Sequence, residues 1–514
     1  MTIALIGILL SLAVLISLAY RGHSVIAVAP VAALIAVVFS GAPILASYTQ
    51  VFMPALAGFL ASFFPLFLTG AIFGKLMTQS GFAAQLASWI SGLLGPSRAL
   101  LVTVLATAML TYGGVSAWVV VFTIFPIATA LFEQADIPRR LMPAAIALGI
   151  FTFATAALPG SPQIHNTIPT RYFGTTTFAA PILGLIGATV VFRLGMYWLS
   201  WRRRKLREAG ESFADLTDAE RRQNLVPGPG VSGNSSTAPG GTVSQTPSSE
   251  ARPDAGGNQN LTATRVAEST RSAPLVTQGA TALQGFIGLL PILVVVATNA
   301  MMTYVIVPAM NTDYLASERF GGIKLESVAG VWSVTVGMVV AILAIFVMQP
   351  ASVREFIGGL SDGAKNAVLP VFTTASEVGY GAVIASLTVF AAVRDGLFGL
   401  SDNALVTSIL STSGISALTG SASGGLTITL STFGKQLAAD ANSQGISLEV
   451  MHRVTAMAST GFDSLPHNGA IITLLLVCGL SHRESYKDIG VVTVIIPVAG
   501  VVVTAALGFM FGAF

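Results

Sequence analysis

The chain has 514 residues, of which 53% are hydrophobic and only 10% are charged, and its formal net charge is +3. A soluble domain carries about 25% charged residues, and apolar runs of about 20 residues, long enough to span a bilayer, recur along this chain. The composition therefore excludes an ordinary water-soluble protein and favours a polytopic membrane protein. Its single cysteine, Cys478, excludes an internal disulfide and a cysteine-based metal site.

Apolar runs predict the membrane spans in chain order. The first run has no basic segment before it, so we expect a retained span and not a cleaved signal. The N-terminal half has expected spans at 3–20, 24–40, 55–78 and 179–200, and the C-terminal half at 284–308, 328–348, 365–390 and 489–513. Each half also contains two longer composite regions, at 98–134 and 138–175 and at 403–440 and 447–482.

A polar segment separates the two halves. It starts with the arginine-rich stretch WRRRKLREAGESF at Trp201 and continues as a sequence rich in proline, glycine, serine and threonine. Such a composition buries too little apolar surface to offset the entropy of ordering, so we expect a largely disordered linker. The arginines place it in the cytoplasm. The predicted domains are an N-terminal membrane repeat, 1–201, a cytoplasmic linker, 202–280, and a C-terminal membrane repeat, 281–514.

Polar and helix-breaking residues interrupt all four composite regions. The stretches TYGGVSAW, at Thr111–Trp118, and TGSASGGL, at Thr419–Leu426, divide the first region of each half into arms too short to cross the hydrocarbon. Each of these regions is predicted to be a re-entrant helical hairpin. The second regions are interrupted at LPGSPQIHN and FDSLPHNG, and each is predicted to be one crossing helix broken by proline.

The interruptions recur at similar separations in the two halves. Pro65 and Pro370 are 305 residues apart, Thr111 and Thr419 are 308 apart, and His165 and His467 are 302 apart. Equivalent points are separated by an odd number of predicted crossings, which gives the halves opposite orientations. The predicted fold is an all-α polytopic membrane protein: an inverted repeat of about five spans each, with two re-entrant hairpins and two broken helices, which is typical of secondary transporters. Coincidence among helices rich in glycine and proline is the alternative.

Broken helices expose backbone groups that suit charged ligands. The N-terminal ends of half-helices favour a carboxylate, and the carbonyl ends favour a cation. No arginine lies at the breaks, which favours a small, singly charged anion with hydroxyl groups. The candidate substrate-binding residues are Tyr112, Gly113, Gly114, Ser116, Ser161, Gln163, His165, Asn166, Ser421, Ser423, Gly424, Gly425, Ser464, His467 and Asn468.

Three ionisable residues are candidates for proton coupling. Asp463 and His467 are four residues apart at a proline break, and a carboxylate within the membrane suggests a functional site. Glu377, in the apolar stretch TTASEVGYG, is the third candidate. Structural roles are the alternatives: Asp463 and the two histidines as helix caps, Glu377 as a partner of a neighbouring threonine, and Tyr112 as a buried aromatic.

The same motifs resemble a known family. LTYGGVSAWVVVFTIFPIA, IPRRLMPAAIALGIFTFATAALPGSPQIHNTIPTRYFGTTT and GFDSLPHNGAIITLL resemble the gluconate permease (GntP) family of the ion-transporter superfamily, over nearly the whole chain outside the linker. The resemblance implies a homodimer in the bacterial cytoplasmic membrane that couples an organic acid to protons, with scaffold and transport domains and an elevator movement. LPGSPQIHN replaces the Pro-His-Pro-Gly-Pro type run of typical gluconate members, and resembles the branch for 3-hydroxybutyrate and short hydroxy acids.

The function predicted from the sequence is therefore proton-coupled symport of a small hydroxy-monocarboxylate similar to 3-hydroxybutyrate. A gluconate or glycerate symporter and a sodium-coupled carrier are alternatives, because asparagine and serine at helix breaks also suit Na⁺. A channel does not need two opposed hairpins, and no HExxH, GxSxG or Cys/His motif indicates an enzyme. We expect no cofactor, no bound metal and no nucleic-acid partner.

Overall fold

The computed structural model describes residues 2–20, 23–215, 281–390, 396, 399, 401–462, 464–466 and 468–513, and these ranges contain helices and no strand. Six of the described helices are long and apolar enough to cross a membrane, namely Ile44–Gln79, Pro181–Glu208, Ala282–Ala309, Glu326–Met348, Pro350–Ser386 and His482–Phe511. The predicted all-α polytopic membrane class is therefore confirmed for this part of the chain. Of the predicted linker, 202–280, residues 216–280 lie outside the described residues, whereas 202–208 are helical, because the helix that starts at Pro181 continues to Glu208 and does not end at the predicted residue 200.

The helices of the N-terminal half are α1 Thr2–Tyr20, α2 Val25–Ser40, α3 Ile44–Ala46, α4 Met53–Gln79, α5 Phe82–Leu94, α6 Ala99–Tyr112, α7 Ala117–Gln134, α8 Met142–Ile150, α9 Phe153–Ala156, α10 Ile164–Phe173 and α11 Pro181–Glu208. Those of the C-terminal half are α14 Ala282–Met301, α15 Val307–Ala309, α16 Glu326–Met348, α17 Val353–Ser386, α19 Ala404–Thr419, α20 Ala422–Ser443, α21 Leu448–Gly461, α22 Gly469–Cys478, α23 His482–Gly490 and α24 Ile496–Phe511.

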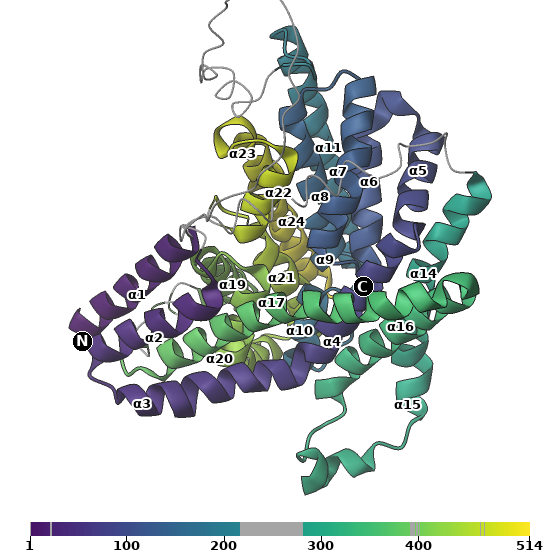
Figure 1. Ribbon diagram of the computed structural model, residues 1–514. Coiled ribbons are helices and arrows are strands. Elements are labelled where there is room, and N and C mark those ends of the chain that lie inside the picture. The colour runs from purple at the N-terminus through teal and green to yellow at the C-terminus, as the bar shows by residue number, and fades with distance from the viewer. Residues whose placement is uncertain are drawn as a thin grey trace, which may run out of the picture.

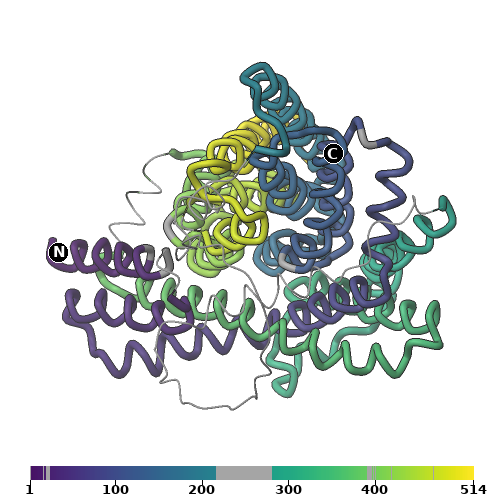
Figure 2. Tube along the Cα trace, turned by 45° about the horizontal axis from the view of Figure 1, so that its top comes forward, coloured from purple at the N-terminus to yellow at the C-terminus, as the bar shows by residue number. Residues whose placement is uncertain are grey.

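The helices form two sets (Figures 1 and 2). The first set, which we call the row, contains α1, α2, α4, α14, α16 and α17, with α4 and α17 side by side across it. The second set, which we call the bundle, contains the interrupted helices α6–α10 and α19–α22 together with α11 and α24. Small residues allow close packing within the row: Ala29, Ala32, Ala33 and Ala36 of α2 are buried against α1 and α17.

Helix α5 connects the two sets and is absent from the predicted spans. Its 13 residues bury one face, Phe82, Ala83, Leu86, Ala87 and Ile90, and pack against α14 of the row and α6 of the bundle. Apolar and polar residues alternate along it with the helical period, so the segment lacks the continuous apolar run that predicts a span. A helical period of apolar residues over these 13 positions is the signal that identifies the segment.

Three long helices contain a π-helical turn, and each turn directly precedes a proline. The turns cover Ser47–Phe52, Met302–Ile306 and Val491–Ile495, and the following α-helical segments have Pro54, Pro308 and Pro497 as their second residue. Proline lacks an N–H and its ring collides with the carbonyl one turn earlier. Widening the preceding turn relieves that collision while the helix continues. For this reason the helix that ends with α4 is continuous from Ile44, and it begins earlier than residue 55, where the predicted span starts.

Helix ends recur at one separation in the two halves. The second hairpin arms begin at Ala117 and Ala422, which are 305 residues apart. The broken helices stop at Ala156 and Gly461 and restart at Ile164 and Gly469, again 305 residues apart in both cases. This separation equals that between Pro65 of α4 and Pro370 of α17.

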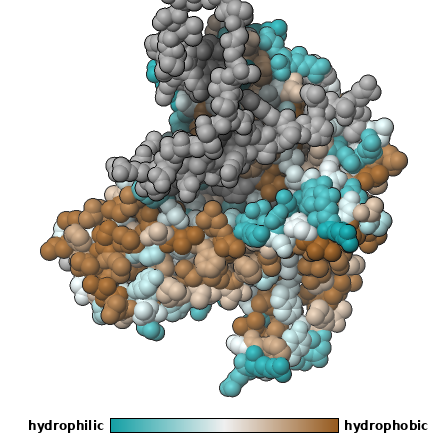
Figure 3. Space-filling model, viewed as in Figure 1, coloured by the Kyte–Doolittle hydropathy of each residue, from teal (hydrophilic) through white to brown (hydrophobic). Residues whose placement is uncertain are grey.

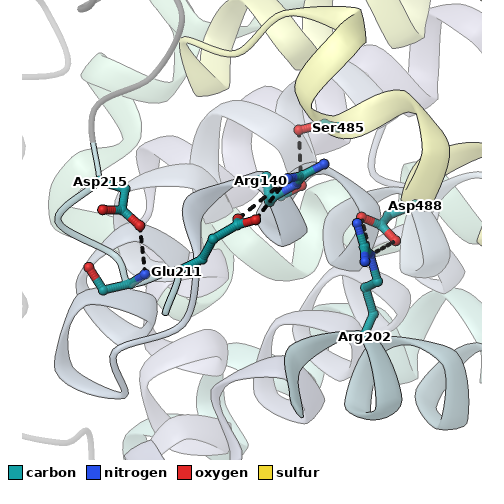
Figure 4. Close-up of polar contacts among 7 residues, drawn as sticks. Arg140, Arg202, Glu211, Asp215, Ser485 and Asp488 are labelled. Carbon is teal, nitrogen blue, oxygen red and sulfur yellow. Dashed lines mark hydrogen bonds and ion pairs between the residues drawn. The ribbon is translucent and has the colours of Figure 1, made fainter. Parts of the chain in front are cut away.

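Charged residues gather at the end of the bundle near α23 (Figure 4). Arg202 of α11 binds Asp488, which is fully buried, with 3.0 Å between Nε and Oδ1. Arg140 binds Glu211 at 3.2 Å, and Ser485 Oγ donates to the Arg140 carbonyl. The opposite end in Figure 1 carries the connection 310–325, whose polar side chains lie below a broad apolar surface in Figure 3. The two polar ends and the apolar surface between them suit a protein that spans a bilayer.

Candidate functional site

Four helix N-termini meet at one cavity of about 1350 Å³. The N-cap residues of α7, α10, α20 and α22 all line it: Ser116, Gln163, Ser421 and Asn468. The cavity lies between these half-helices of the bundle and the row, which contributes Met338 and the polar residues Thr373, Thr374 and Glu377. A helix N-terminus presents unpaired N–H groups and a partial positive charge, so this convergence creates a region suited to an anion.

The turn between α6 and α7 is held against the first helix break. Gly114 has a φ of 92°, in the left-handed region that favours glycine, and Val115 N–H bonds back to the Leu110 carbonyl at 3.1 Å, which closes the end of α6. Gln163 Nε2 donates to the carbonyls of Thr111 at 2.7 Å and Val115 at 3.3 Å. The side chain of an N-cap residue therefore satisfies carbonyls of the hairpin turn.

The turn between α19 and α20 is held in the same way. Gly420 has a φ of 64° and ends α19. Asn468 Nδ2 donates to the Gly420 carbonyl at 2.8 Å, while its Oδ1 accepts from the N–H groups of Ala470 and Ile471. Asn468 thus caps its own half-helix and fastens the hairpin turn of its own half; Gln163, 305 residues earlier in the chain, fastens a hairpin turn but does not cap its helix.

The two pairs of helix ends differ in capping. Ser421 Oγ accepts from Gly424 N–H at 3.1 Å, and Asn468 caps α22, so side chains already satisfy N–H groups at the ends of the C-terminal half. The side chains of Ser116 and Gln163 make no such bond to α7 and α10. The first turns of α7 and α10 consequently offer the better donors for a substrate carboxylate.

Glu377 is the acidic residue among the described residues that line the cavity. It belongs to α17, only 4% of it is exposed, and its Oε2 is buried with no hydrogen-bond partner within the described structure. A Cβ atom added at Gly424 would collide with Oε2 of this carboxyl group and would lie 3.0 Å from the Ser421 hydroxyl. The carboxyl group is therefore directed at the first turn of α20.

Among the described residues that line the cavity, the basic side chains are His23 and His165, and no lysine or arginine is present. His165 Nδ1 is buried without a hydrogen-bond partner in the described part of the chain. The cavity begins at the α6–α7 and α19–α20 turns. From there it extends along α7, past Phe122, Phe125 and Thr129, and along α22 to Val477. It can hold a small anion through N–H and hydroxyl donors, and its remaining wall is largely apolar.

The structure places the predicted site residues in two groups. Those that line the cavity are Gly114, Ser116, Gln163, His165, Ser421, Ser423, Asn468 and Glu377. Those that do not line it are Tyr112, Gly113, Ser161, Asn166, Gly424, Gly425 and Ser464. Asp463 and His467 lie outside the described residues, so their predicted roles stay predictions.

The second group has structural contacts. Tyr112 Oη donates to the Pro159 carbonyl at 2.9 Å, and Ser161 Oγ donates to the Ala154 carbonyl at 3.0 Å. The Ser464 carbonyl accepts from Tyr486 Oη at 3.0 Å. A Cβ on Gly113 would collide with Ile292, and one on Gly425 with Ser416, so these two glycines allow close helix packing.

Sequence reasoning missed three polar residues on one face of α21 that hold the first break in place. Arg453 is fully buried and donates to the Ala156 carbonyl at 2.9 Å, the Ala179 carbonyl at 2.6 Å and Asn166 Oδ1 at 2.8 Å. His452 Nδ1 lies 2.7 Å from Thr175 Oγ1, and Glu449 Oε2 accepts from Ala180 N–H. The signal was the stretch LEVMHRV within a composite region, because an ionisable residue in a membrane helix is costly unless it has a role.

An all-helical membrane fold that brings interrupted helices to one internal cavity is that of a membrane transport protein. Comparison with known proteins supports this class. The chain is 38% identical over 497 residues to "Uncharacterized transporter YxjC" of Bacillus subtilis (strain 168), covering 96% of each sequence. It is 30% identical over 149 residues, or 29% of the chain, to an "Uncharacterized transporter" of Haemophilus influenzae. No model of a protein family matches. The chain belongs to the transporter family of the Bacillus subtilis protein.

Proposed function

We propose that the protein is a proton-coupled symporter of a small hydroxy-monocarboxylate. The observation that carries the proposal is the meeting of four half-helix N-termini at a cavity whose described lining contains no lysine or arginine. Backbone N–H groups and hydroxyls bind one carboxylate and neighbouring hydroxyl groups well, whereas a multiply charged anion needs fixed cations. The apolar wall suits a short carbon chain such as that of 3-hydroxybutyrate, and a gluconate or glycerate carrier is the alternative with more substrate hydroxyls.

The constant separation of 305 residues supports an inverted repeat as the basis of alternating access. It relates Ser116 to Ser421 and Gln163 to Asn468, so that each half supplies one hairpin and one broken helix. Since both hairpin turns lie against the row, we propose that the row is the scaffold and that the bundle moves past it as an elevator. A scaffold of this kind also suits a homodimer, which the resemblance to the gluconate permease family implies.

The cavity's shape supports an inward-facing state. Its wall follows α7 toward Gln134 and the arginines at 139–140, and it reaches His23 at the connection between α1 and α2. The positive-inside rule assigns both connections to the cytoplasm. We propose the bacterial cytoplasmic membrane as the location, with residues 202–280 on the inner side.

Proton coupling is proposed on three carboxyl or imidazole groups. Glu377 lies at the cavity with an unpartnered oxygen, while Asp463 and His467 follow α21 in the sequence. A carboxyl group in a dry cavity binds a proton readily, because burial disfavours its charged form. Sodium coupling remains the competing hypothesis, since the helix breaks also carry asparagine and serine oxygens.

Uptake into proteoliposomes tests the proposal. Labelled 3-hydroxybutyrate and gluconate are supplied with an inward proton gradient, with an inward sodium gradient, and with neither. We expect accumulation of 3-hydroxybutyrate with the proton gradient, and its loss on adding a protonophore. Protein-free liposomes control for leakage. Accumulation with sodium alone would replace the proton by Na⁺, and no uptake of either acid under any gradient would overturn the proposed substrate class.

A further inference from the structure

We propose that the imidazole of His165 binds the hydroxyl group of the substrate and so makes the carrier selective for 3-hydroxy acids over unsubstituted acids of the same length. This role rests on the proposed function and assigns one group of the substrate to one side chain of that cavity.

Many polar side chains of the cavity wall already bond within the protein. The amide groups of Gln163 and Asn468 hold the two hairpin turns. The threonines that donate their hydroxyls to nearby backbone carbonyls are Thr129, Thr155, Thr373, Thr419 and Thr460. A hydroxyl whose hydrogen is already donated can accept a bond from a substrate but cannot donate one to it.

The ring of His165 keeps unused hydrogen-bonding capacity. Among the described residues that line the cavity, Thr111 Oγ1, His165 Nδ1 and Glu377 Oε2 are buried atoms without a hydrogen-bond partner. Native proteins leave few buried polar atoms unsatisfied, so each of these calls for an explanation. Thr111 is 1% exposed and Glu377 is 4% exposed, whereas His165 is partly exposed. His165 is therefore the member of this set that a bound substrate reaches most easily.

Its place in the helix brings the ring to the expected carboxylate position. His165 is the second residue of α10, so its own backbone N–H is one of the unpaired donors of the first turn, and the N-cap residue Gln163 does not cap them. Side chains on a helix tilt toward its N-terminus, so the imidazole leans toward the same end. A carboxylate bound by these N–H groups consequently lies beside the ring.

The spacing of the substrate groups fits this arrangement. In 3-hydroxybutyrate one methylene group separates the carboxylate carbon from the carbon that carries the hydroxyl. With the carboxylate at the first turn of α10, the hydroxyl therefore stays close to the residue that binds the carboxylate. Both protonation states of an imidazole offer an N–H donor, and the neutral ring adds an acceptor, so a hydroxyl group can pair with either state.

The other half of the protein has no such ring at the equivalent break. The residue 305 positions after His165 is Ala470, which also lines the cavity. Its backbone N–H already donates to Asn468 Oδ1 at 2.7 Å. Uncapped N–H groups and a free imidazole thus coincide at the α10 end, which favours one orientation of the substrate.

These facts predict which acids the cavity rejects. An acid without the hydroxyl still places its carboxylate at the α7 and α10 ends, but it leaves the ring of His165 unpaired against an apolar chain. A site built to hydrogen-bond a substrate hydroxyl discriminates strongly against an analogue that lacks it, because the polar group of the site is left unsatisfied.

Two acids form a matched pair for the test. Butyrate has the structure of 3-hydroxybutyrate with the hydroxyl replaced by hydrogen. Counterflow is measured in proteoliposomes that contain unlabelled 3-hydroxybutyrate, without any ion gradient, so that a defect in coupling does not affect the readout. Initial rates are taken in strongly buffered vesicles, because butyric acid itself crosses lipid. The inhibition constant of external butyrate is divided by that of external unlabelled 3-hydroxybutyrate.

We expect a ratio of about tenfold or more for the wild type and a ratio near one for His165→Phe, which keeps a ring but loses both nitrogen atoms. His165→Gln keeps a donor and an acceptor and should retain a higher ratio than His165→Phe. If His165→Phe does not reach the membrane, His165→Leu repeats the loss of both nitrogen atoms. His23→Phe is the matched control: His23 is exposed at the connection between α1 and α2, and this variant should keep the wild-type ratio.

The outcomes separate the two proposals. Wild-type counterflow of 3-hydroxybutyrate with an unchanged ratio in His165→Phe would overturn the role of His165 and leave the transport function intact. If both inhibition constants rise equally in that variant, the ring binds the carboxylate and not the hydroxyl, which also overturns the role. A wild type that binds butyrate as tightly as 3-hydroxybutyrate would do the same. No counterflow of 3-hydroxybutyrate or gluconate by the wild type would instead overturn the proposed function.

Discussion

Replacing Arg453 by methionine should destabilise the protein, because this side chain supplies hydrogen bonds at the end of the first half-helix. The guanidinium donates to the carbonyls of Ala156 and Ala179 and to Asn166 Oδ1. Asn166 Oδ1 also faces His452 Nε2 at 3.3 Å, so it keeps a possible partner. The two carbonyls lose the donor that Arg453 provides.

The size of the effect follows from these contacts. A buried acceptor left without its donor costs about 1–3 kcal/mol, so two carbonyls cost about 2–6 kcal/mol. Part of this loss is offset in the variant, because burying a methionine side chain lacks the desolvation cost of burying a guanidinium group. We expect a net loss of about 2–4 kcal/mol in the free energy of unfolding, close to the upper range for single substitutions. Arg453→Lys keeps the charge with fewer donors and should show a smaller loss.

Unfolding in mixed micelles with increasing dodecyl sulfate measures this loss. Tryptophan fluorescence reports global unfolding, and thiol labelling of the single cysteine, Cys478 of α22, reports opening of the bundle. Arg171→Met is the matched control, since Arg171 is an exposed arginine on α10. Equal unfolding midpoints for wild type and Arg453→Met would refute the reasoning and show that other donors or water satisfy these carbonyls.

Three further predictions concern the cavity. Gly114→Leu should abolish uptake at normal membrane levels, because its side chain would collide with Met338 in a left-handed backbone; unchanged kinetics would exclude this turn from the site. Asn468→Asp keeps the cap of α22 but loses the donor to the hairpin turn, so KM for uptake should rise with little change in unfolding midpoint, whereas Asn468→Ala should also lose about 1 kcal/mol of stability. Asp463→Asn should lose proton-driven accumulation and keep exchange; if accumulation survives, proton carriage moves to Glu377.

Much of this architecture was accessible from the sequence, because it depends on local chemistry. Glycine and proline stretches mark helix interruptions through backbone sterics alone, and α6 does end at Tyr112 while α7 begins at Ala117. Long apolar runs predicted membrane helices because each backbone group in lipid must be satisfied within its own helix. Helix α5 was not predicted, because its apolar face shows only as a helical periodicity within a short segment.

Only part of the candidate site could be predicted from the sequence, because composition does not say which way a side chain points. Ser161 and Ser116 are the same residue type beside neighbouring breaks, yet Ser161 bonds to the Ala154 carbonyl while Ser116 lines the cavity. Gly424 and Gly425 are adjacent, but one faces the Glu377 carboxyl group and the other packs on Ser416. The sequence by itself determined the membrane class and the positions of the helix breaks. Tertiary packing alone decided which broken ends share the cavity, that Arg453 holds the first break, and that Glu377 lies at only one of two similar hairpins, because these are contacts between residues far apart in the chain.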